Sequence, residues 1–203
     1  MHDQLNLAEM VAGFTPDVKN WLCHYRLYHQ LDSTNQYLLD HPETDLVISE
    51  QQHSGRGQHG RSWYSPAGKN IYLSVRWHTK AQQNTAQTTL IVAQAVQQLC
   101  QKLDLQHARI KPPNDLMLGG RKAAGILIEA TTQGMEVDLV IGIGINVWMQ
   151  ASTDQPPIDQ PWTSLAEAAG ITLASAPAYP NFNRNHMISQ LLNILYNKLR
   201  QHA

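Results

Sequence analysis

The glycine pair Gly119-Gly120 restricts the fold of this chain more than any other sequence feature, because it separates two β-type runs. The runs are Leu116 to Leu118 and Ala124 to Glu129. Both glycines tolerate the positive φ angles of a tight primed turn. These residues are therefore expected to form a β-hairpin, with the two strands as antiparallel neighbours in one sheet.

Further β-type runs and two amphipathic helical patterns surround this hairpin. Residues 137–146 predict another strand, in which Gly142 and Gly144 allow a ligand or a second backbone to approach closely. Apolar residues recur at helical spacing over 85–103 and at the C-terminus, about 184–202. The other predicted elements are a short helix after the cap cluster 32–35 and strands at 46–48, 71–77 and 109–111. The pattern predicts an α/β or α+β fold with loops at 150–161 and 176–184.

Length and charge exclude several classes of function. The 203 residues are enough for a single domain with its own core. Because 15 Lys and Arg face 16 Asp and Glu, no overall basic field favours DNA or an anionic membrane. The 2 cysteines, Cys23 and Cys100, are far apart and are expected to be reduced thiols. We expect a cytoplasmic protein without a signal peptide, a membrane helix or a structural metal site.

The glycine-rich segment 55–61 (Gly-Arg-Gly-Gln-His-Gly-Arg) is the first candidate for chemistry. Its glycines let the backbone turn tightly and aim successive N–H groups at an anion, and Arg56 and Arg61 add positive charge. A phosphate or carboxylate site is one interpretation, and a surface loop without a ligand is the other. The segment is neither a Walker loop nor a Rossmann fingerprint, because it lacks Gly-Lys-Ser/Thr and no helical pattern begins at its third glycine.

The corner Lys111-Pro112-Pro113-Asn114-Asp115 is the second candidate. The prolines fix the backbone and exclude a helix, so the polar side chains are presented from a rigid turn. A carboxylate beside an amide suits Mg²⁺ or a nucleotide. The alternative interpretation is an ordinary Pro-Asn-Asp turn.

Lys122 is the third candidate, because it begins a strand that otherwise has a buried pattern. Its small neighbours Ala123, Ala124 and Gly125 leave room for a ligand. A partly desolvated lysine at this position would attract a carboxylate or a phosphoryl oxygen strongly. The alternative is a lysine in solvent at the edge of a hairpin.

Taken together and in this order, motifs from about Leu31 to Val147 resemble the catalytic domain of biotin protein ligases, a family that also includes lipoate ligases. The biotin branch fits better, because the GRGxxGR and Pro-Asn-Asp motifs occur together. The matching motifs are Asp32-Ser33-Thr34-Asn35, GRGxxGR at 55–61 with Trp63-Tyr64-Ser65-Pro66, Gly68-x-Asn70-Ile71-Tyr72-Leu73-Ser74, Lys111-x-Pro113-Asn114-Asp115-Leu116, Arg121-Lys122-x-Ala124-Gly125-Ile126-Leu127 and Gly142-Ile143-Gly144-Ile145-Asn146.

The resemblance implies an α+β fold with a mixed β-sheet backed by helices, similar to class II aminoacyl-tRNA synthetases. It implies one catalytic domain over 1–203, with a motif core at about 31–147, no N-terminal DNA-binding domain and no C-terminal barrel domain. The implied reaction uses ATP and Mg²⁺ to convert biotin into biotinyl-5′-AMP. The biotinyl group then passes to a lysine of a biotin carboxyl carrier domain, as in acetyl-CoA carboxylase or a similar acceptor. A homodimer through an exposed sheet edge is compatible with the family.

The resemblance also assigns roles to residues. Lys122 and Arg56 are the expected catalytic cations, and Asp115 is the expected Mg²⁺ ligand with ATP. The residues expected to contact biotin are Ser33, Thr34, Asn35, Gln52, Arg56, Gly57, Gln58, Trp63, Lys122 and Gly125. The residues expected to contact ATP are Arg61, Lys111, Asn114, Asp115 and Asn146.

Two positions depart from the pattern of the family. Gln58 and Pro112 stand where the family more often has arginine and tryptophan. These departures, with the missing C-terminal domain, motivate one alternative, a non-catalytic protein that binds biotin or an acyl adenylate. The second alternative is a lipoate or octanoate protein ligase.

Overall fold

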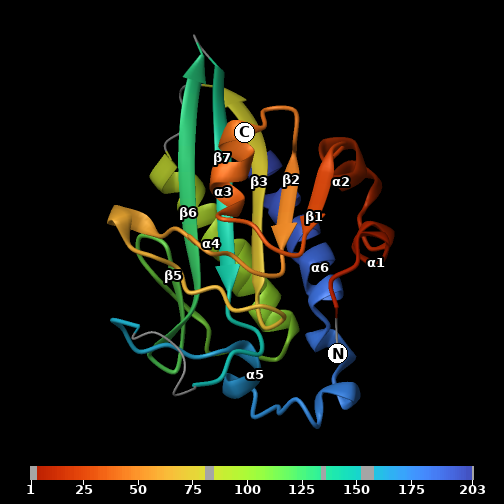
Figure 1. The fold of residues 1–203 in the computed structure, drawn as a ribbon, viewed down its shortest axis with the longest axis vertical. Coiled ribbons are helices and arrows are strands. Elements are labelled where there is room, and N and C mark those ends of the chain that lie inside the picture. Colours follow the sequence, from red (N-terminus) through yellow and green to blue (C-terminus); the bar gives the residue numbers. More distant parts are fainter. Residues whose placement is uncertain (1–3, 81–84, 134–135, 152–157, 203) are drawn as a thin grey trace.

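The protein contains one seven-stranded mixed sheet (Figure 1). The computed structural model describes residues 4–80, 85–133, 136–151 and 158–202. The strands lie in the order β1-β2-β3-β7-β6-β5-β4, and only the first pair is parallel. The predicted mixed sheet is therefore confirmed. The bounds are β1 Tyr25–Tyr28, β2 Leu46–Ser49, β3 Ile71–Lys80, β4 Arg109–Lys111, β5 Asp115–Leu118, β6 Arg121–Gln133 and β7 Glu136–Ile145.

Helices cover both faces of this sheet. The long helices α4 and α6 pack together behind it, and the short helix α3 lies in front (Figure 1). Alternate residues of β2 show the two faces, because Leu46 and Ile48 join the large core while Val47 packs in a small core with Leu38. The bounds are α1 Leu7–Ala12, α2 Pro16–Trp21, α3 Thr34–Asp40, α4 Thr85–Lys102, α5 Leu165–Ala168 and α6 Arg184–Gln201.

The predicted hairpin at Gly119 and Gly120 is confirmed, with φ angles of 56° and 76° at these residues. The strands β5 and β6 flank this turn and contain one irregularity that the sequence did not reveal. Leu116 pairs with Ala124 and Met117 pairs with Lys122, so Ala123 is an extra residue in β6. Such a bulge moves the following side chains to the opposite face of the strand.

Several short elements escaped prediction. The sequence pattern gave no signal for the short helices α1, α2 and α5, because helices of six or four residues carry too little periodicity. It also gave no signal for the four-residue strand β1. The predicted loop 176–184 contains two single 3₁₀ turns, at Ala176–Ala178 and Pro180–Phe182, and α6 begins at its last residue. Within the predicted loop 150–161, residues 152–157 lie outside the described residues.

Both cysteines are free, as predicted. Cys23 is exposed, and burial raises the pKa of the Cys100 thiol to about 12. No helix in the described parts of the chain is both long enough and apolar enough to cross a bilayer.

Candidate active site

A floor of three glycines lies on the front face of the sheet, beside α3. Gly125 of β6 pairs with Gly144 of β7, and Gly142 lies two residues before Gly144. A Cβ atom on Gly144 would lie 2.6 Å from the indole ring of Trp63, and one on Gly142 would overlap Oδ1 of Asn35. Glycine is therefore required here because the Trp63 and Asn35 side chains lie directly against the strands.

The bulge in β6 places Lys122 on this same face. Lys122 and Gly125 are three residues apart, so they would point to opposite faces of a regular strand. The extra residue Ala123 shifts the alternation by one position, so that Lys122 and Gly125 face the same side. A Cβ atom added to Gly125 would lie 3.3 Å from Cε of Lys122. A backbone irregularity thus brings the lysine to the glycine floor.

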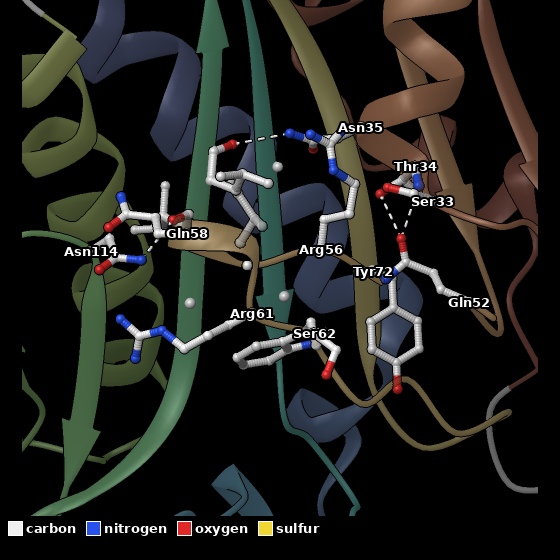
Figure 2. Close-up of a pocket in the computed structure, with 18 of the residues that line it drawn as sticks. Ser33, Thr34, Asn35, Gln52, Arg56, Gln58, Arg61, Ser62, Tyr72 and Asn114 are labelled. Atoms are coloured by element: carbon white, nitrogen blue, oxygen red, sulfur yellow. Dashed lines mark hydrogen bonds between the residues drawn. The ribbon is translucent and has the colours of Figure 1, made fainter. Parts of the chain in front are cut away.

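A cavity above the floor gathers most of the predicted site residues. Its walls come from the start of α3, from Gln52, from the glycine-rich segment and from β5 and β6 (Figure 2). The predicted residues that line this cavity are Ser33, Thr34, Asn35, Gln52, Arg56, Gly57, Gln58, Arg61, Trp63, Asn114, Asp115, Lys122 and Gly125. Further lining residues, to which the sequence assigned no role in binding, are Ser62, Tyr72, Leu73, Ile126, Leu127, Ile143 and Gln160.

A second cavity adjoins the first. The two share Gln52, Arg61, Ser62, Trp63, Lys122 and Gln160. Among the predicted site residues, Asn146 lines only the second cavity, where its buried Nδ2 donates to the carbonyl oxygen of Thr163 at 3.0 Å. Lys122 therefore lines both of two adjacent cavities.

Lys111 does not reach either cavity. It is the last residue of the edge strand β4, and its side chain is exposed. The turn at Pro112 and Pro113 reverses the chain, so that Asp115 faces the first cavity while Lys111 remains at the edge. The structure thus separates Lys111 from Asn114 and Asp115, with which the sequence motif had grouped it.

Lys122 is buried, with 9% of its surface exposed, which contradicts the alternative of a lysine in solvent. Its Nζ lies 2.7 Å from Oδ1 of Asp115 and 5.2 Å from the centre of the Trp63 ring. Both the carboxylate and the aromatic face stabilise the ammonium charge. The cation is consequently held in place before any ligand binds.

The guanidinium of Arg56 is also paired. Its Nη2 donates to Oε1 of Glu129 at 2.7 Å and its Nη1 donates to Oε1 of Gln36 at 3.0 Å. The other oxygen of Glu129 accepts a hydrogen bond from Nδ2 of Asn35 at 2.9 Å. Sequence reasoning missed Glu129, although a carboxylate at the end of the apolar run 124–128 was a usable signal.

A polar wall lies at the start of α3. The backbone N–H and the hydroxyl of Thr34 both donate to Oε1 of Gln52, at 2.8 and 3.1 Å (Figure 2). Ser74, to which the sequence motif had assigned no role, is buried and donates to Oδ1 of Asn35 at 2.6 Å. Ser33 caps α3 by accepting from the backbone N–H of Gln36. Thr34, Asn35 and Gln52, three of the residues predicted to bind biotin, thus belong to one polar wall.

Two aromatic residues complete the cavity. In the described part of the structure, the buried Nε1 of Trp63 has no hydrogen-bond partner, so it is a donor that a ligand can use. Burial raises the pKa of Tyr72, and its hydroxyl donates to the carbonyl oxygen of Pro66. Tyr72 therefore stays uncharged across the physiological pH range and contributes shape and hydrogen bonding, not charge.

Comparison with known proteins agrees with this geometry. The sequence profile of the biotin/lipoate A/B protein ligase family matches residues 27–146, more than half of the chain. The chain belongs to this family. The match includes the glycine-rich segment, the Asn114-Asp115 corner, Lys122 and all three glycines of the floor.

Two curated members of the biotin/lipoate ligase family illustrate the relationship. The bifunctional ligase/repressor BirA of Salmonella typhimurium is 42% identical over 151 residues, which cover 70% of this chain and 46% of that protein. The biotin–(acetyl-CoA-carboxylase) ligase of Paracoccus denitrificans is 36% identical over 104 residues, which cover 50% of this chain and 43% of that protein. The chain therefore matches less than half the length of either relative.

A solved structure supports the fold. The biotin protein ligase of Aquifex aeolicus, crystallised with biotin and ATP, matches with a TM-score of 0.71 at 24% identity. The match covers 88% of this chain and 71% of that one. The α+β sheet with helices described above is thus the fold of the biotin protein ligases.

Proposed function

We propose that this chain is the catalytic unit of a biotin protein ligase. It would activate biotin with ATP to biotinyl-5′-AMP and then transfer the biotinyl group to a lysine of a biotin carboxyl carrier domain. Acetyl-CoA carboxylase is the expected source of that domain, because a matched relative is named for it. The observation that carries the proposal is the buried Lys122, which lines both of two adjacent cavities.

The first cavity suits biotin. The bicyclic ring needs an apolar slot with one polar wall for its ureido group. Leu127 and the Trp63 indole supply apolar surface, while Thr34 and Gln52 offer a hydroxyl and an amide. The valeryl carboxylate would then point toward Lys122.

The second cavity, which includes Asn146, would take ATP. In the first half-reaction a biotin carboxylate oxygen forms a bond to the α-phosphorus, and the bond from that phosphorus to the bridging oxygen of pyrophosphate breaks. Two anions must approach, so negative charge builds up in the transition state. Lys122 and Arg56 would stabilise this charge, and the buried setting of Lys122 reduces screening by water.

In the second half-reaction the neutral amine of the carrier lysine attacks the acyl carbon of biotinyl-5′-AMP. An amide bond forms, AMP leaves with the electron pair of the broken acyl–oxygen bond, and the amine proton is released. The glycine-rich segment between Arg56 and Trp63 would cover the mixed anhydride and exclude water that hydrolyses it.

Magnesium would enter with the nucleotide. No group of three His, Cys, Asp or Glu side chains that could hold a metal occurs among the described residues. Asp115 is a carboxylate in the first cavity, and Mg²⁺ in nucleotide sites is commonly held by one or two carboxylates together with phosphates. Asp115 would therefore hold the ion jointly with ATP, and the ion would reduce the charge repulsion of the phosphates.

Two alternatives make different demands on the site. A lipoate or octanoate ligase binds a linear acyl chain, which has no ureido group to form hydrogen bonds with the wall at Thr34 and Gln52. A non-catalytic binder has no transition state to stabilise, so a buried lysine between two cavities gives it little advantage. Both features favour the biotin ligase.

The test measures acyl-adenylate formation by mass spectrometry with ATP, Mg²⁺ and biotin, lipoate or octanoate. We expect biotinyl-5′-AMP as the preferred product. Lys122→Ala should lower its rate about 10²- to 10³-fold, the usual loss when one stabilising donor is removed from a transition state. Lys102→Ala, at an exposed lysine that lines neither cavity and has no expected role, is the matched control and should retain the rate.

Preference for lipoate or octanoate would favour the sister enzyme. Biotin binding without any adenylate would favour the binder. An unchanged rate in Lys122→Ala would remove the lysine from the mechanism.

A further inference from the structure

The glycine-rich segment 55–61 and the two residues after it are held at both ends, at Glu129 of β6 and at Gln52. At the first end, the Arg56 guanidinium contacts Glu129 of β6 at 2.7 Å. At the second end, Ser65 links the segment to Gln52, because its Oγ accepts from Nε2 of Gln52 and donates to the carbonyl oxygen of Trp63, each at 2.9 Å. The segment is therefore positioned before a ligand arrives.

A chain of hydrogen bonds and one close hydroxyl–hydroxyl contact joins these two ends through the pocket wall. Glu129 accepts from Asn35, Asn35 accepts from Ser74, and the Ser74 hydroxyl lies 2.8 Å from Oγ1 of Thr34. Thr34 donates to Gln52. Glu129 is the charged acceptor among these hydrogen-bonded residues. It pairs with Arg56, one of the two cations proposed to stabilise an anionic ligand.

We propose that Glu129 is a positioning residue that holds Arg56 before a ligand binds. The ion pair between Glu129 and Arg56 must break when an anionic ligand binds. This inference rests on the proposed function, in which the ligand is the carboxylate of biotin. Glu129 then sets the affinity for the charged end of the ligand, separately from the affinity for its ring.

The pair is exposed enough to exchange partners. Arg56 and Glu129 are 41% and 23% exposed, so water can solvate each charge when they separate. Lys122 and Asp115, at 11% and 13%, form a much less exposed pair. Arg56 can therefore turn toward a ligand at lower cost than Lys122 can.

The charge of Glu129 opposes the carboxylate of the ligand. Glu129 remains beside the pocket after Arg56 turns away, because Asn35 still donates to its second oxygen. A glutamine keeps an oxygen that can accept from Asn35 and removes the charge. Glu129→Gln should thus tighten the binding of a charged ligand and leave a neutral ligand nearly unaffected.

The experiment compares biotin with biotinamide, its uncharged amide, by titration calorimetry near neutral pH on the full chain. We expect Glu129→Gln to shift the ratio of the two dissociation constants about five- to tenfold in favour of biotin, the size of one partly screened charge interaction. Glu167→Gln is the matched control, because Glu167 forms a 2.6 Å pair with Arg121 and does not line the first cavity. It should leave the ratio unchanged.

Equal changes for both ligands would overturn the proposal, since a purely structural Glu129 affects the whole pocket. An unchanged ratio, or a selective loss of biotin binding, would overturn it as well. Hydrogen exchange of residues 55–63 without ligand gives an independent readout, and Glu129→Gln should speed that exchange. If the wild-type protein bound neither ligand, the proposed function would fail, and hydrogen exchange would still decide whether Glu129 holds the segment.

Discussion

Gln58 is a residue at which the pocket differs in charge from the family pattern that the motifs resemble. It begins the 3₁₀ turn Gln58–Gly60, is half-buried and lines the first cavity together with Arg61 and Asn114 (Figure 2). Its amide can donate a hydrogen bond to a phosphate oxygen, but it carries no charge. An arginine at this position would add a charge-assisted, bidentate contact.

Gln58→Arg should therefore slow the escape of biotinyl-5′-AMP, by about tenfold for one added charge-assisted hydrogen bond. The measurement is the rate at which preformed adenylate leaves the protein, followed by its hydrolysis in solution. Equal rates in the two proteins would show that the side chain at position 58 does not contact the adenylate.

Strands β6 and β7 build the site through two local features, the bulge at Ala123 and the glycine floor. Ile141, Ile143 and Ile145 of β7 pack in the large core, and the alternate residues Gly142 and Gly144 face the pocket. The back face of β7 therefore packs in the core, and its front face leaves room for the side chains of Asn35 and Trp63.

Gly142→Ala should destabilise the protein by about 1–3 kcal/mol, because the new methyl group overlaps the Asn35 amide, which is fixed by Ser74 and Glu129. Urea unfolding measures this cost. In an Asn35→Ala background the overlap is gone, and the same substitution should be close to neutral. Equal costs in both backgrounds would contradict the close approach of Asn35 to the strand.

At the scale of the whole molecule, a buried ion pair joins the C-terminal helix to the pocket. Nη1 of Arg184, at the start of α6, contacts Oε2 of Glu50 at 2.7 Å and the carbonyl oxygen of Asn70 at 3.1 Å. Glu50 also accepts from the backbone N–H of Leu5 and lies two residues before Gln52. The pair thus ties both terminal regions to the segment that carries the polar wall.

Glu50→Gln should cost about 3–5 kcal/mol of unfolding free energy, because it removes the charge of one partner of a buried ion pair. The exposed pair Arg200 and Asp17, 3.9 Å apart, provides the comparison, and Asp17→Asn should cost less than about 1 kcal/mol. Chemical denaturation of the two variants distinguishes them. Similar small losses in both would show that the Glu50 site is hydrated.

Local sequence signals predicted the parts of this molecule that depend on neighbours in the chain. The Gly119-Gly120 hairpin, the long helices and most strands follow from periodicity and turn chemistry. The contact between Arg56 and Glu129 could not be predicted, because 73 residues separate them and only the packing of the glycine-rich segment on β6 joins them. The place of Lys111 outside both cavities could not be predicted either, since a motif does not specify which side of a turn faces the pocket.

In the proposed reaction this protein transfers biotin to a protein lysine, with Lys122 lining both cavities. The intact mass of a biotin carboxyl carrier domain after incubation with this protein, ATP, Mg²⁺ and biotin measures that transfer. We predict the gain of one biotinyl group that depends on ATP and is slowed about 10²- to 10³-fold by Lys122→Ala. An unmodified carrier with the wild-type protein, or modification by Lys122→Ala at the wild-type rate, would contradict the proposed function.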